Sequence, residues 1–410
     1  MNILLINHYA GSPEMGMEFR PYYLAKEWVQ MGHKVDIIAA DYSHLRRKNP
    51  VISKDFEVEV IDGINYHWIH TRTYEGNGAS RAITMAQFVG KLWINAKKII
   101  KDLEPDTVIC SSTYPLDTFV GQRIRKKSRK PVKLVHEVHD MWPATLYEIG
   151  GMSKRNPFVV AMQIGENSAY KKSDNVVSLL PFAEPYMKEH GLQPGKFLSI
   201  PNGVVEDEWS NPTQLPDKHK ESLDRIHAQG KYIVGYFGGH ALSNALDMVI
   251  YIADSIKDKD IHFVLVGNGV EKQRLVEECQ RRRLENITFL DSIPKTAIPT
   301  LCENFDCIFM GAIESPLYRF GLCLNKMFDA MRAGKPILCA ITTPGTYVEE
   351  YKCGIRVDSF DIEACINAID TIKNLNCEDL ELMSNNGKIA IKNNFTYEKL
   401  AKEFIKRMEK

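Results

Sequence analysis

The sequence lacks any apolar run long enough to cross a bilayer, and this absence limits what the protein can be. Of its 410 residues 44% are hydrophobic and 25% are charged, as in a globular protein. No stretch of about 18 apolar residues occurs, so we expect no transmembrane helix. The start, Met1 to Ile6, has neither a basic residue nor a small-residue cleavage site after it, so we expect no secretory signal peptide.

The chain also lacks a net charge, because 52 Lys and Arg balance 52 Asp and Glu. A neutral total argues against a nucleic-acid partner. The balance hides an asymmetry. Residues 1–200 hold 26 basic and 21 acidic side chains, and residues 81–133 hold 12 basic against 4 acidic.

Cysteines are present, but their spacing matches no motif of paired cysteines. The nine of them form no CxxC motif, and most lie in apolar runs such as Ile337 to Ala340. We therefore expect buried reduced thiols in a cytoplasmic protein, and neither disulfides nor a zinc site.

The length exceeds the roughly 100–200 residues of an ordinary domain, so we expect two domains. Short apolar strands alternate with helical stretches from Ile3 onward, which predicts a parallel α/β sheet. Residues 202–230 are polar with weak periodicity and are interpreted as a connection, after which the alternation restarts. We predict two doubly wound, Rossmann-like domains facing one another across a cleft. Their limits are 1–205 and 206–395, with 396–410 a helix that could return to the first domain.

The segment from Glu314 to Pro336 carries the strongest chemical pattern. It follows a predicted strand, so its loop is expected at the ligand-binding edge of the second sheet. A helix is predicted from near Gly321 to Gly334, with Lys326 in its first turn, where the helix dipole disfavours a cation. A phosphate at that helix end would explain Lys326 and the nearby Arg319. Alternatively, both cations are solvated and Asp329 merely pairs with Lys326.

Other strand-end loops have weaker patterns. Gly238, Gly239 and His240 form a flexible turn that could present backbone N–H groups to an anion. Gly267-Asn268-Gly269 lacks the third glycine of a dinucleotide fingerprint, which disfavours a nicotinamide dehydrogenase. A plain strand-to-helix turn is the alternative for both loops.

The first domain offers two candidate groups. Gly11 to Gly16, with Glu14 inside it and Arg20 beyond it, follows the first strand; its glycines could instead serve only tight packing. His139 and Asp140 stand at the end of another buried strand, where polar side chains favour a role in the cleft.

These segments together resemble glycosyltransferase family 4, which has the two-domain GT-B fold. Ala330-Met331-Arg332-Ala333-Gly334-Lys335-Pro336 matches the family's donor-nucleotide motif, with Asp329 at its acidic position. Phe320 to Asp329 is similar to one branch, bacterial transferases that build surface polysaccharides from nucleotide N-acetylamino sugars. The resemblance implies that the donor is a UDP-sugar.

The resemblance also implies roles for individual residues. Donor binding would involve the following: Asp329 at the ribose, Asn325, Gly321, Leu322 and Glu314 nearby, Gly238, Gly239 and His240 at the diphosphate, Ile293 at the base, and Gly16 between donor and acceptor. Arg20 and Glu14 would serve the acceptor or a phosphate. His139, Asp140, Lys326 and Arg319 would be catalytic. One departure is the missing Glu-x7-Glu pair, since Gly321 stands eight residues before Asp329; whether Glu314 replaces the first glutamate stays open.

The expected chemistry uses no metal and no cofactor. Asp258-Lys259-Asp260 resembles a metal-binding DxD motif but lies in a charged loop that we interpret as surface. Lys326, Arg319 and helix-end N–H groups would then stabilise the leaving diphosphate. The family retains the anomeric configuration. The sequence shows no obvious pair of carboxylates that could act as acid and nucleophile, as in a hydrolase, so we expect front-face attack by the acceptor.

The basic stretch 81–133 favours an anionic acceptor. Apolar residues from Met85 to Leu103 mark an amphipathic helix flanked by lysines, and Arg123 to Lys130 add six cations. Such a surface could hold anionic lipid head groups, including an undecaprenyl-diphosphate-linked acceptor at the cytoplasmic face of the inner membrane. An ordinary packed helix with a solvated rim is the alternative.

We therefore predict a retaining, metal-independent glycosyltransferase, a hexosyltransferase or N-acetylaminosugar transferase, peripheral to the membrane and active in O-antigen or capsule synthesis. A UDP-sugar 2-epimerase of the same fold is the first alternative. A non-catalytic sugar- or lipid-binding protein is the second.

Overall fold

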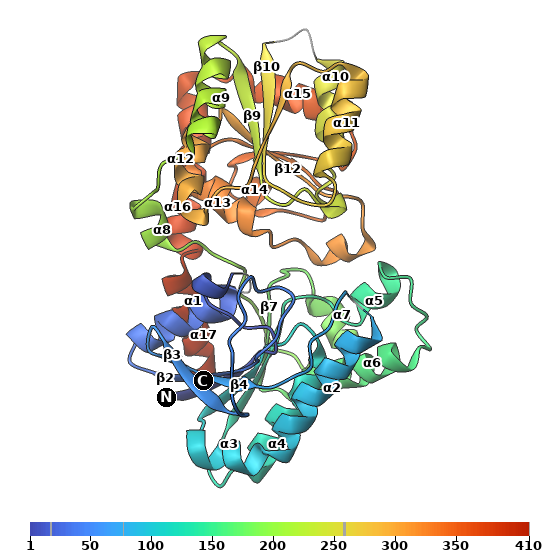
Figure 1. Cartoon of the computed structure of the whole chain (residues 1–410), viewed down its shortest axis with the longest axis vertical. Coiled ribbons are helices and arrows are strands. Elements are labelled where there is room, and N and C mark those ends of the chain that lie inside the picture. The colour runs from blue at the N-terminus through green and yellow to red at the C-terminus, as the bar shows by residue number, and fades with distance from the viewer. Residues whose placement is uncertain (17–18, 77, 257–259, 410) are drawn as a thin grey trace. The chain divides into compact units, whose positions relative to one another are not determined.

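The computed structural model describes residues 1–16, 19–76, 78–256 and 260–409, which form two compact units (Figure 1). The first unit comprises Met1–Pro201 together with Tyr397–Lys410, and the second comprises Asn202–Thr396. The boundary predicted from the sequence, 205, lies slightly beyond Pro201. Asp258 and Lys259 of the DxD-like motif lie outside the described residues.

The sheet of the first unit has eight strands in the order β3-β4-β2-β1-β5-β6-β7-β8. All neighbours pair in parallel except β3 and β4, which form an antiparallel hairpin. The strands are β1 (Asn2–Ile6), β2 (Lys34–Ala40), β3 (Glu57–Ile61), β4 (Ile64–Ile69), β5 (Thr107–Cys110), β6 (Lys133–Val138), β7 (Asn175–Ser178) and β8 (Phe197–Ser199). The order reverses between β1 and β5, and this makes their carboxyl ends the expected place for a ligand.

Helices cover this sheet because its central strands, such as β1, β2 and β5, are buried apolar runs that need partners on both faces. The helices are α1 (Phe19–Gln30), α2 (Ala79–Ile94), α3 (Ala96–Leu103), α4 (Thr118–Lys127), α5 (Ala144–Glu148), α6 (Pro157–Lys172), α7 (Glu184–Glu189) and α17 (Tyr397–Glu409), with short 3-10 turns η1 (Pro13–Met15) and η2 (Pro115–Asp117). The C-terminal helix α17 packs against α1. Trp28 donates its indole N–H to the carbonyl of Ala401 at 3.2 Å, and its ring contacts Phe404 edge-on.

The prediction of one continuous amphipathic helix from Met85 to Leu103 is wrong. The structure divides it into α2 and α3 at Asn95, whose backbone leaves the helical region (φ −85°, ψ 8°). The Asn95 side chain donates to the carbonyl of Lys91 at 2.9 Å, which caps the end of α2. The apolar stripe nevertheless packs as expected, because Phe88, Leu92, Ile99 and neighbouring residues join the core with β1, β2 and β5.

The second unit has a six-stranded, fully parallel sheet in the order β11-β10-β9-β12-β13-β14. Counted along the chain, this is the Rossmann order 3-2-1-4-5-6, with its reversal between β9 and β12. The strands are β9 (Tyr232–Phe237), β10 (Ile261–Val266), β11 (Ile287–Leu290), β12 (Cys307–Gly311), β13 (Ile337–Ala340) and β14 (Gly354–Val357).

Separate apolar clusters fill the two faces of this sheet. The helices are α8 (Glu206–Ser210), α9 (Asp217–Ala228), α10 (Asp247–Ser255), α11 (Lys272–Arg282), α12 (Ile298–Glu303), α13 (Asn325–Ala333), α14 (Tyr347–Glu350), α15 (Ile362–Lys373) and α16 (Cys377–Asn394), with 3-10 turns η3 (Leu242–Asn244), η4 (Lys295–Ala297) and η5 (Pro316–Phe320). No helix among the described residues of either unit is long and apolar enough to cross a membrane.

Two expectations for the second unit need correction. The supposed connection 202–230 contains the helices α8 and α9, and α9 buries Leu223 and Ile226 despite its weak periodicity. The helix expected from near Gly321 begins instead at Asn325. Gly321 ends η5 with φ 87°, a left-handed conformation that does not continue a helix.

Candidate active site

The candidate donor site of the second unit begins at the carboxyl ends of β9 and β10. The loop after β9 carries Gly238, Gly239 and His240, and the loop after β10 carries Gly267 and Gly269. The loops are bonded together, since His240 donates its backbone N–H to Asn268 at 2.9 Å. A Cβ added to Gly267 would lie 1.9 Å from the Gly238 carbonyl oxygen, so only glycine fits there.

Helix α13 brings Lys326 to the same place. Its ammonium group donates to Asn244 Oδ1 at 2.6 Å and to Tyr236 Oη at 3.3 Å, and it lies 4.6 Å from the centre of the Tyr236 ring. Asn244 and Tyr236 in turn donate to the Gly239 carbonyl at 2.9 and 2.8 Å. Lys326 and the Gly238–Gly239 turn are therefore parts of one hydrogen-bonded network.

Burial lowers the pKa of Lys326 to about 7. An ammonium group taken out of water loses hydration, and no carboxylate among the described residues bonds to it. An anion placed beside it would replace that hydration and restore the charge. The position is thus suited to a group that carries its own negative charge, such as a phosphate.

The start of α13 has further unused capacity for an anion. Its N-cap is Leu324, which has no side-chain acceptor to offer the first N–H groups. A helix start without a capping side chain attracts negative charge through free N–H groups and the helix dipole. Asn325, the first residue of the helix, is exposed.

His240 lies in the same loop and is fully buried. Burial, with the charges of Lys272 and Lys326, lowers its pKa to about 4, so the ring is neutral near pH 7. Neither ring nitrogen has a hydrogen-bond partner among the described residues, which is unusual for a buried polar group.

Asp329 stands one turn deeper in α13 and has different neighbours. Burial raises its pKa to about 6, the Lys295 charge and a hydrogen bond from Trp209 lower it, and the Glu208 charge raises it. Lys295 and Glu208 form an ion pair of 2.8 Å. The half-buried Ile293, predicted near the base, belongs to the segment that leads into Lys295, so the predicted ribose and base contacts lie in one region.

The remaining donor candidates lie in the loop between β12 and α13. Glu314 and Arg319 are exposed; the Arg319 guanidinium lies 4.2 Å from the Phe320 ring and donates to the Pro316 carbonyl. Gly321 and Leu322 lead toward the start of α13, where Leu322 packs on the core. The clamp of two cations expected from the sequence is thus built differently: Lys326 contacts the glycine turn, whereas Arg319 contacts its own loop.

The candidate residues of the first unit gather at the carboxyl ends of β1, β5 and β6. The His139 ring nitrogen Nε2 lies 2.9 Å from the Ser111 hydroxyl and 3.4 Å from Glu137 Oε2. Ser111 donates to the same carboxylate oxygen at 2.6 Å. Asp140, the next residue after His139, is exposed at this edge.

Arg20 completes this network from α1. It is buried, and its guanidinium donates to Glu137 Oε1 and to the carbonyls of Ile200 and Pro201. Burial alone would raise the pKa of Glu137, but Arg20, His139 and Ser111 hold it well below its ordinary value. These contacts make Arg20 the counter-ion of Glu137, and its role toward a phosphate or acceptor stays a prediction.

Glu14 and Gly16 lie at the turn η1. Glu14 is exposed, and Gly16 ends the turn with φ 76°, where a Cβ would come within 3.1 Å of the Arg47 side chain. Glycine at this position is therefore explained by the backbone, and the structure leaves its predicted donor role untested.

Sequence reasoning missed several polar residues of these edges. Tyr236, Asn244 and Trp209 contact the predicted donor residues, and Ser111 and Glu137 join His139. Ser111 directly follows a predicted strand, so the rule that placed His139 at a strand end could have found it. The described residues contain no group of three or more His, Cys, Asp or Glu side chains arranged to hold a metal ion.

Comparison with family models matches residues 15–208 to Glycosyltransferase Family 4 and residues 218–390 to Glycosyl transferases group 1. The chain belongs to glycosyltransferase family 4. The putative colanic acid biosynthesis glycosyl transferase WcaI of Escherichia coli K12 is 27% identical over 147 residues. That match covers 35% of this family 4 chain and 35% of the relative.

Solved structures confirm the fold of this family 4 chain. Sucrose-phosphate synthase from Thermosynechococcus elongatus has a TM-score of 0.70 at 16% identity and covers 99% of this chain and 98% of its own. Anabaena Alr3699/HepE in complex with UDP has a TM-score of 0.69 at 15% identity over the whole of both chains. The predicted class, α/β with two Rossmann-like domains of the GT-B fold, is correct.

Proposed function

We propose that this glycosyltransferase moves a sugar from a UDP-sugar to a lipid-linked or glycan acceptor during bacterial surface polysaccharide synthesis. One observation carries the proposal: Lys326, at the uncapped start of α13, reaches the glycine turn after β9 at the switch point of a Rossmann sheet. Asp329 lies one turn deeper, within reach of a ribose whose diphosphate occupies that position.

The comparisons support the donor and the pathway class. Similar structures hold UDP or UDP-glucose in Anabaena Alr3699/HepE. The relative from E. coli is named for colanic acid biosynthesis. By resemblance we propose an N-acetylamino sugar as the donor sugar, and O-antigen or capsule as the product class, made at the cytoplasmic face of the inner membrane.

The proposed mechanism retains the anomeric configuration and uses no metal. Lys326 and the first N–H groups of α13 would stabilise the leaving diphosphate electrostatically. His139, held by Ser111 and Glu137, would donate to a sugar hydroxyl, and Asp140 would orient the acceptor. The acceptor hydroxyl would attack from the face of the departing phosphate and pass its proton to it.

The test is turnover of radiolabelled UDP-N-acetylglucosamine and UDP-glucose, with and without an undecaprenyl-diphosphate-linked sugar. We expect label in the lipid fraction only when the acceptor is present, unchanged by EDTA, with a retained anomeric configuration by NMR. Asp329→Asn should lose the activity, whereas Asp224→Asn, an exposed change on α9, should keep it. A sugar that changes identity without acceptor would establish an epimerase instead. Inactivity with every donor and acceptor would favour a binding protein.

A further inference from the structure

A basic pocket of the first unit lies at the amino ends of the sheet strands, whereas the His139 network of the same unit lies at their carboxyl ends. Helix α3 ends just before β5 begins, and α4 ends just before β6 begins, so both helix ends meet at the amino edge of the sheet. The pocket between them has a volume of about 790 Å³. Its charged lining is five cations and one carboxylate: Lys97, Lys101, Lys127, Arg129, Lys130 and Glu104.

Most of these cations have no counter-ion. Lys130 pairs with Asp106 and donates to the Glu104 carbonyl at 2.7 Å. The other four, which are Lys97 and Lys101 on α3, Lys127 at the end of α4 and Arg129 after it, are exposed and have neither an ion pair nor a hydrogen bond within the described part of the chain. Like charges gathered without counter-ions repel one another, so the arrangement favours an anionic occupant.

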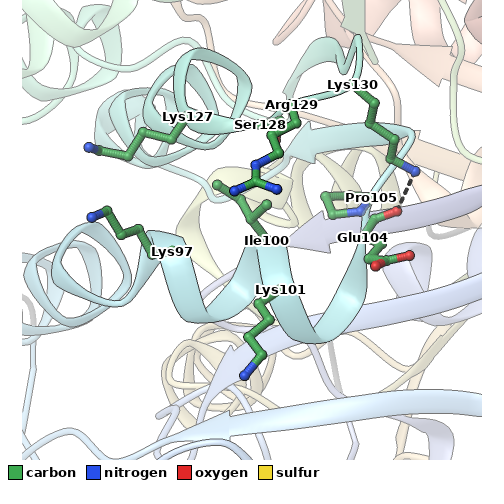
Figure 2. Close-up of a pocket in the computed structure, with 9 residues that line it drawn as sticks. All are labelled: Lys97, Ile100, Lys101, Glu104, Pro105, Lys127, Ser128, Arg129 and Lys130. Carbon is green, nitrogen blue, oxygen red and sulfur yellow. Dashed lines mark hydrogen bonds between the residues drawn. The ribbon is translucent and has the colours of Figure 1, made fainter.

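Figure 2 shows how these side chains surround the space. The Arg129 guanidinium lies between the two helices above Ile100, and the ammonium groups of Lys97 and Lys127 point toward the same side. Lys101 points away from them, and Lys130 turns toward Glu104. Lys97 of α3, Lys127 of α4 and Arg129 after α4 therefore line one cavity, together with the apolar Ile100 and Pro105.

Helix electrostatics explain only part of this cluster. Cations in a last turn complement the helix dipole, and this accounts for Lys101 in α3 and Lys127 in α4. Lys97 stands in the first turn of α3, and Arg129 lies beyond the end of α4, so the dipole of neither helix requires them.

Exposed apolar side chains stand close by in the chain. Ile94 and Trp93 end α2 just before α3, with 77% and 40% of their surfaces exposed. The Arg123 guanidinium of α4 lies 4.4 Å from the Trp93 ring, which places the aromatic residue beside the basic helix. Exposed aromatic and aliphatic side chains next to cations are typical of a surface that enters the headgroup region of a bilayer.

We propose that this pocket binds the phosphate headgroups of anionic phospholipids and docks the first unit on a bilayer. The phosphates would pair with Arg129, Lys97 and Lys127, while Trp93 and Ile94 enter the interface. The neighbouring apolar pair favours a lipid over a soluble phosphate. The pocket and the His139 network lie at opposite edges of one sheet, so docking does not depend on the transferase reaction.

The test is flotation with phosphatidylglycerol-containing vesicles and with pure phosphatidylcholine vesicles at physiological salt. The pocket variant carries Lys97→Gln, Lys101→Gln, Lys127→Gln and Arg129→Gln. The control variant loses the same charge at exposed lysines elsewhere: Lys54→Gln, Lys171→Gln, Lys218→Gln and Lys220→Gln. We expect the wild type and the control to bind only the anionic vesicles, and the pocket variant to bind them roughly tenfold or more weakly.

Equal loss in both variants would overturn the pocket in favour of general charge attraction. A wild type that binds neither kind of vesicle would overturn docking on a bilayer altogether. Calorimetry with pyrophosphate distinguishes a soluble anion from a lipid headgroup. If the wild type binds pyrophosphate but no vesicles, and the pocket variant loses pyrophosphate binding, the site is one for a free anion and the lipid proposal is overturned. UDP affinity and melting temperature should match the wild type in both variants. The single Arg129→Glu change gives a second measurement that does not depend on the folding of the fourfold variant.

Discussion

The affinity for UDP should depend on pH through Lys326. Burial lowers the pKa of this ammonium group to about 7, and a bound diphosphate would raise it toward its ordinary value. The charged form binds the diphosphate, so binding takes up a proton and weakens as pH rises through the pKa of the free protein. In the free protein Lys326 is charged in about half of the molecules at pH 7 and in roughly 3% of them at pH 8.5. This difference predicts an approximately 15-fold loss of affinity for UDP.

Isothermal titration calorimetry measures both consequences. The dissociation constant gives the pH dependence, and two buffers of different ionisation enthalpy give the number of protons taken up. Lys326→Arg should remove the dependence, since a guanidinium stays charged throughout this range. Lys220→Arg, on the exposed face of α9, should keep it.

Two results would refute the reasoning. The first is a wild-type affinity that is flat between pH 7 and 8.5, which would mean that the diphosphate does not meet an uncharged Lys326. The second is an unchanged slope in Lys326→Arg, which would move the titrating group elsewhere.

Three further outcomes are expected. Asp329→Asn should weaken UDP binding by roughly 10- to 100-fold in calorimetry, because a charged hydrogen-bond acceptor for the ribose is lost. Gly267→Ala should lower the melting temperature clearly, since its Cβ meets the Gly238 carbonyl, whereas Gly239→Ala meets no atom and should change little. Glu137→Gln should cost about 3–5 kcal/mol of unfolding free energy near pH 7, because Arg20 loses its buried counter-ion. The depressed pKa of Glu137 means that this contribution is complete above about pH 4.5 and is lost as pH falls further, so urea denaturation of the variant should show less acid sensitivity.

Much of the fold follows from local pattern. Buried parallel strands such as β1 and β9 are continuous apolar runs, and their alternation with helices leaves few topologies open. The hairpin of β3 and β4 was missed because Val58 and Val60 face solvent on an edge strand and give no buried run. Helix α9 was missed because only one narrow stripe of it is buried.

The sequence predicts where the candidate site residues lie in the fold, but not which residues they contact. Strand ends located the Gly238 turn, the start of α13 and His139, since parallel strands share one ligand-binding edge. The contacts of the individual cations depend on residues far away in sequence. Arg20 meets Glu137, 117 residues away, and Lys326 meets Asn244, 82 residues away. No local spacing encodes such pairs, so Arg20 and Arg319 were indistinguishable from Lys326 in the sequence.

Because the chain returns to its first unit at the C-terminus, the two units differ in how they can be expressed as separate fragments. The second unit starts and finishes on adjacent backbone, where Val204 bridges Thr396 and donates to the Phe395 carbonyl at 2.8 Å. It is thus a single uninterrupted segment, Asn202–Thr396, inserted within the other unit. We expect a fragment of those residues to fold alone, which would allow nucleotide binding to be tested on it. A fragment that stops at Pro201 would leave Trp28 without Ala401 and Phe404, and it would need α17 rejoined by a linker.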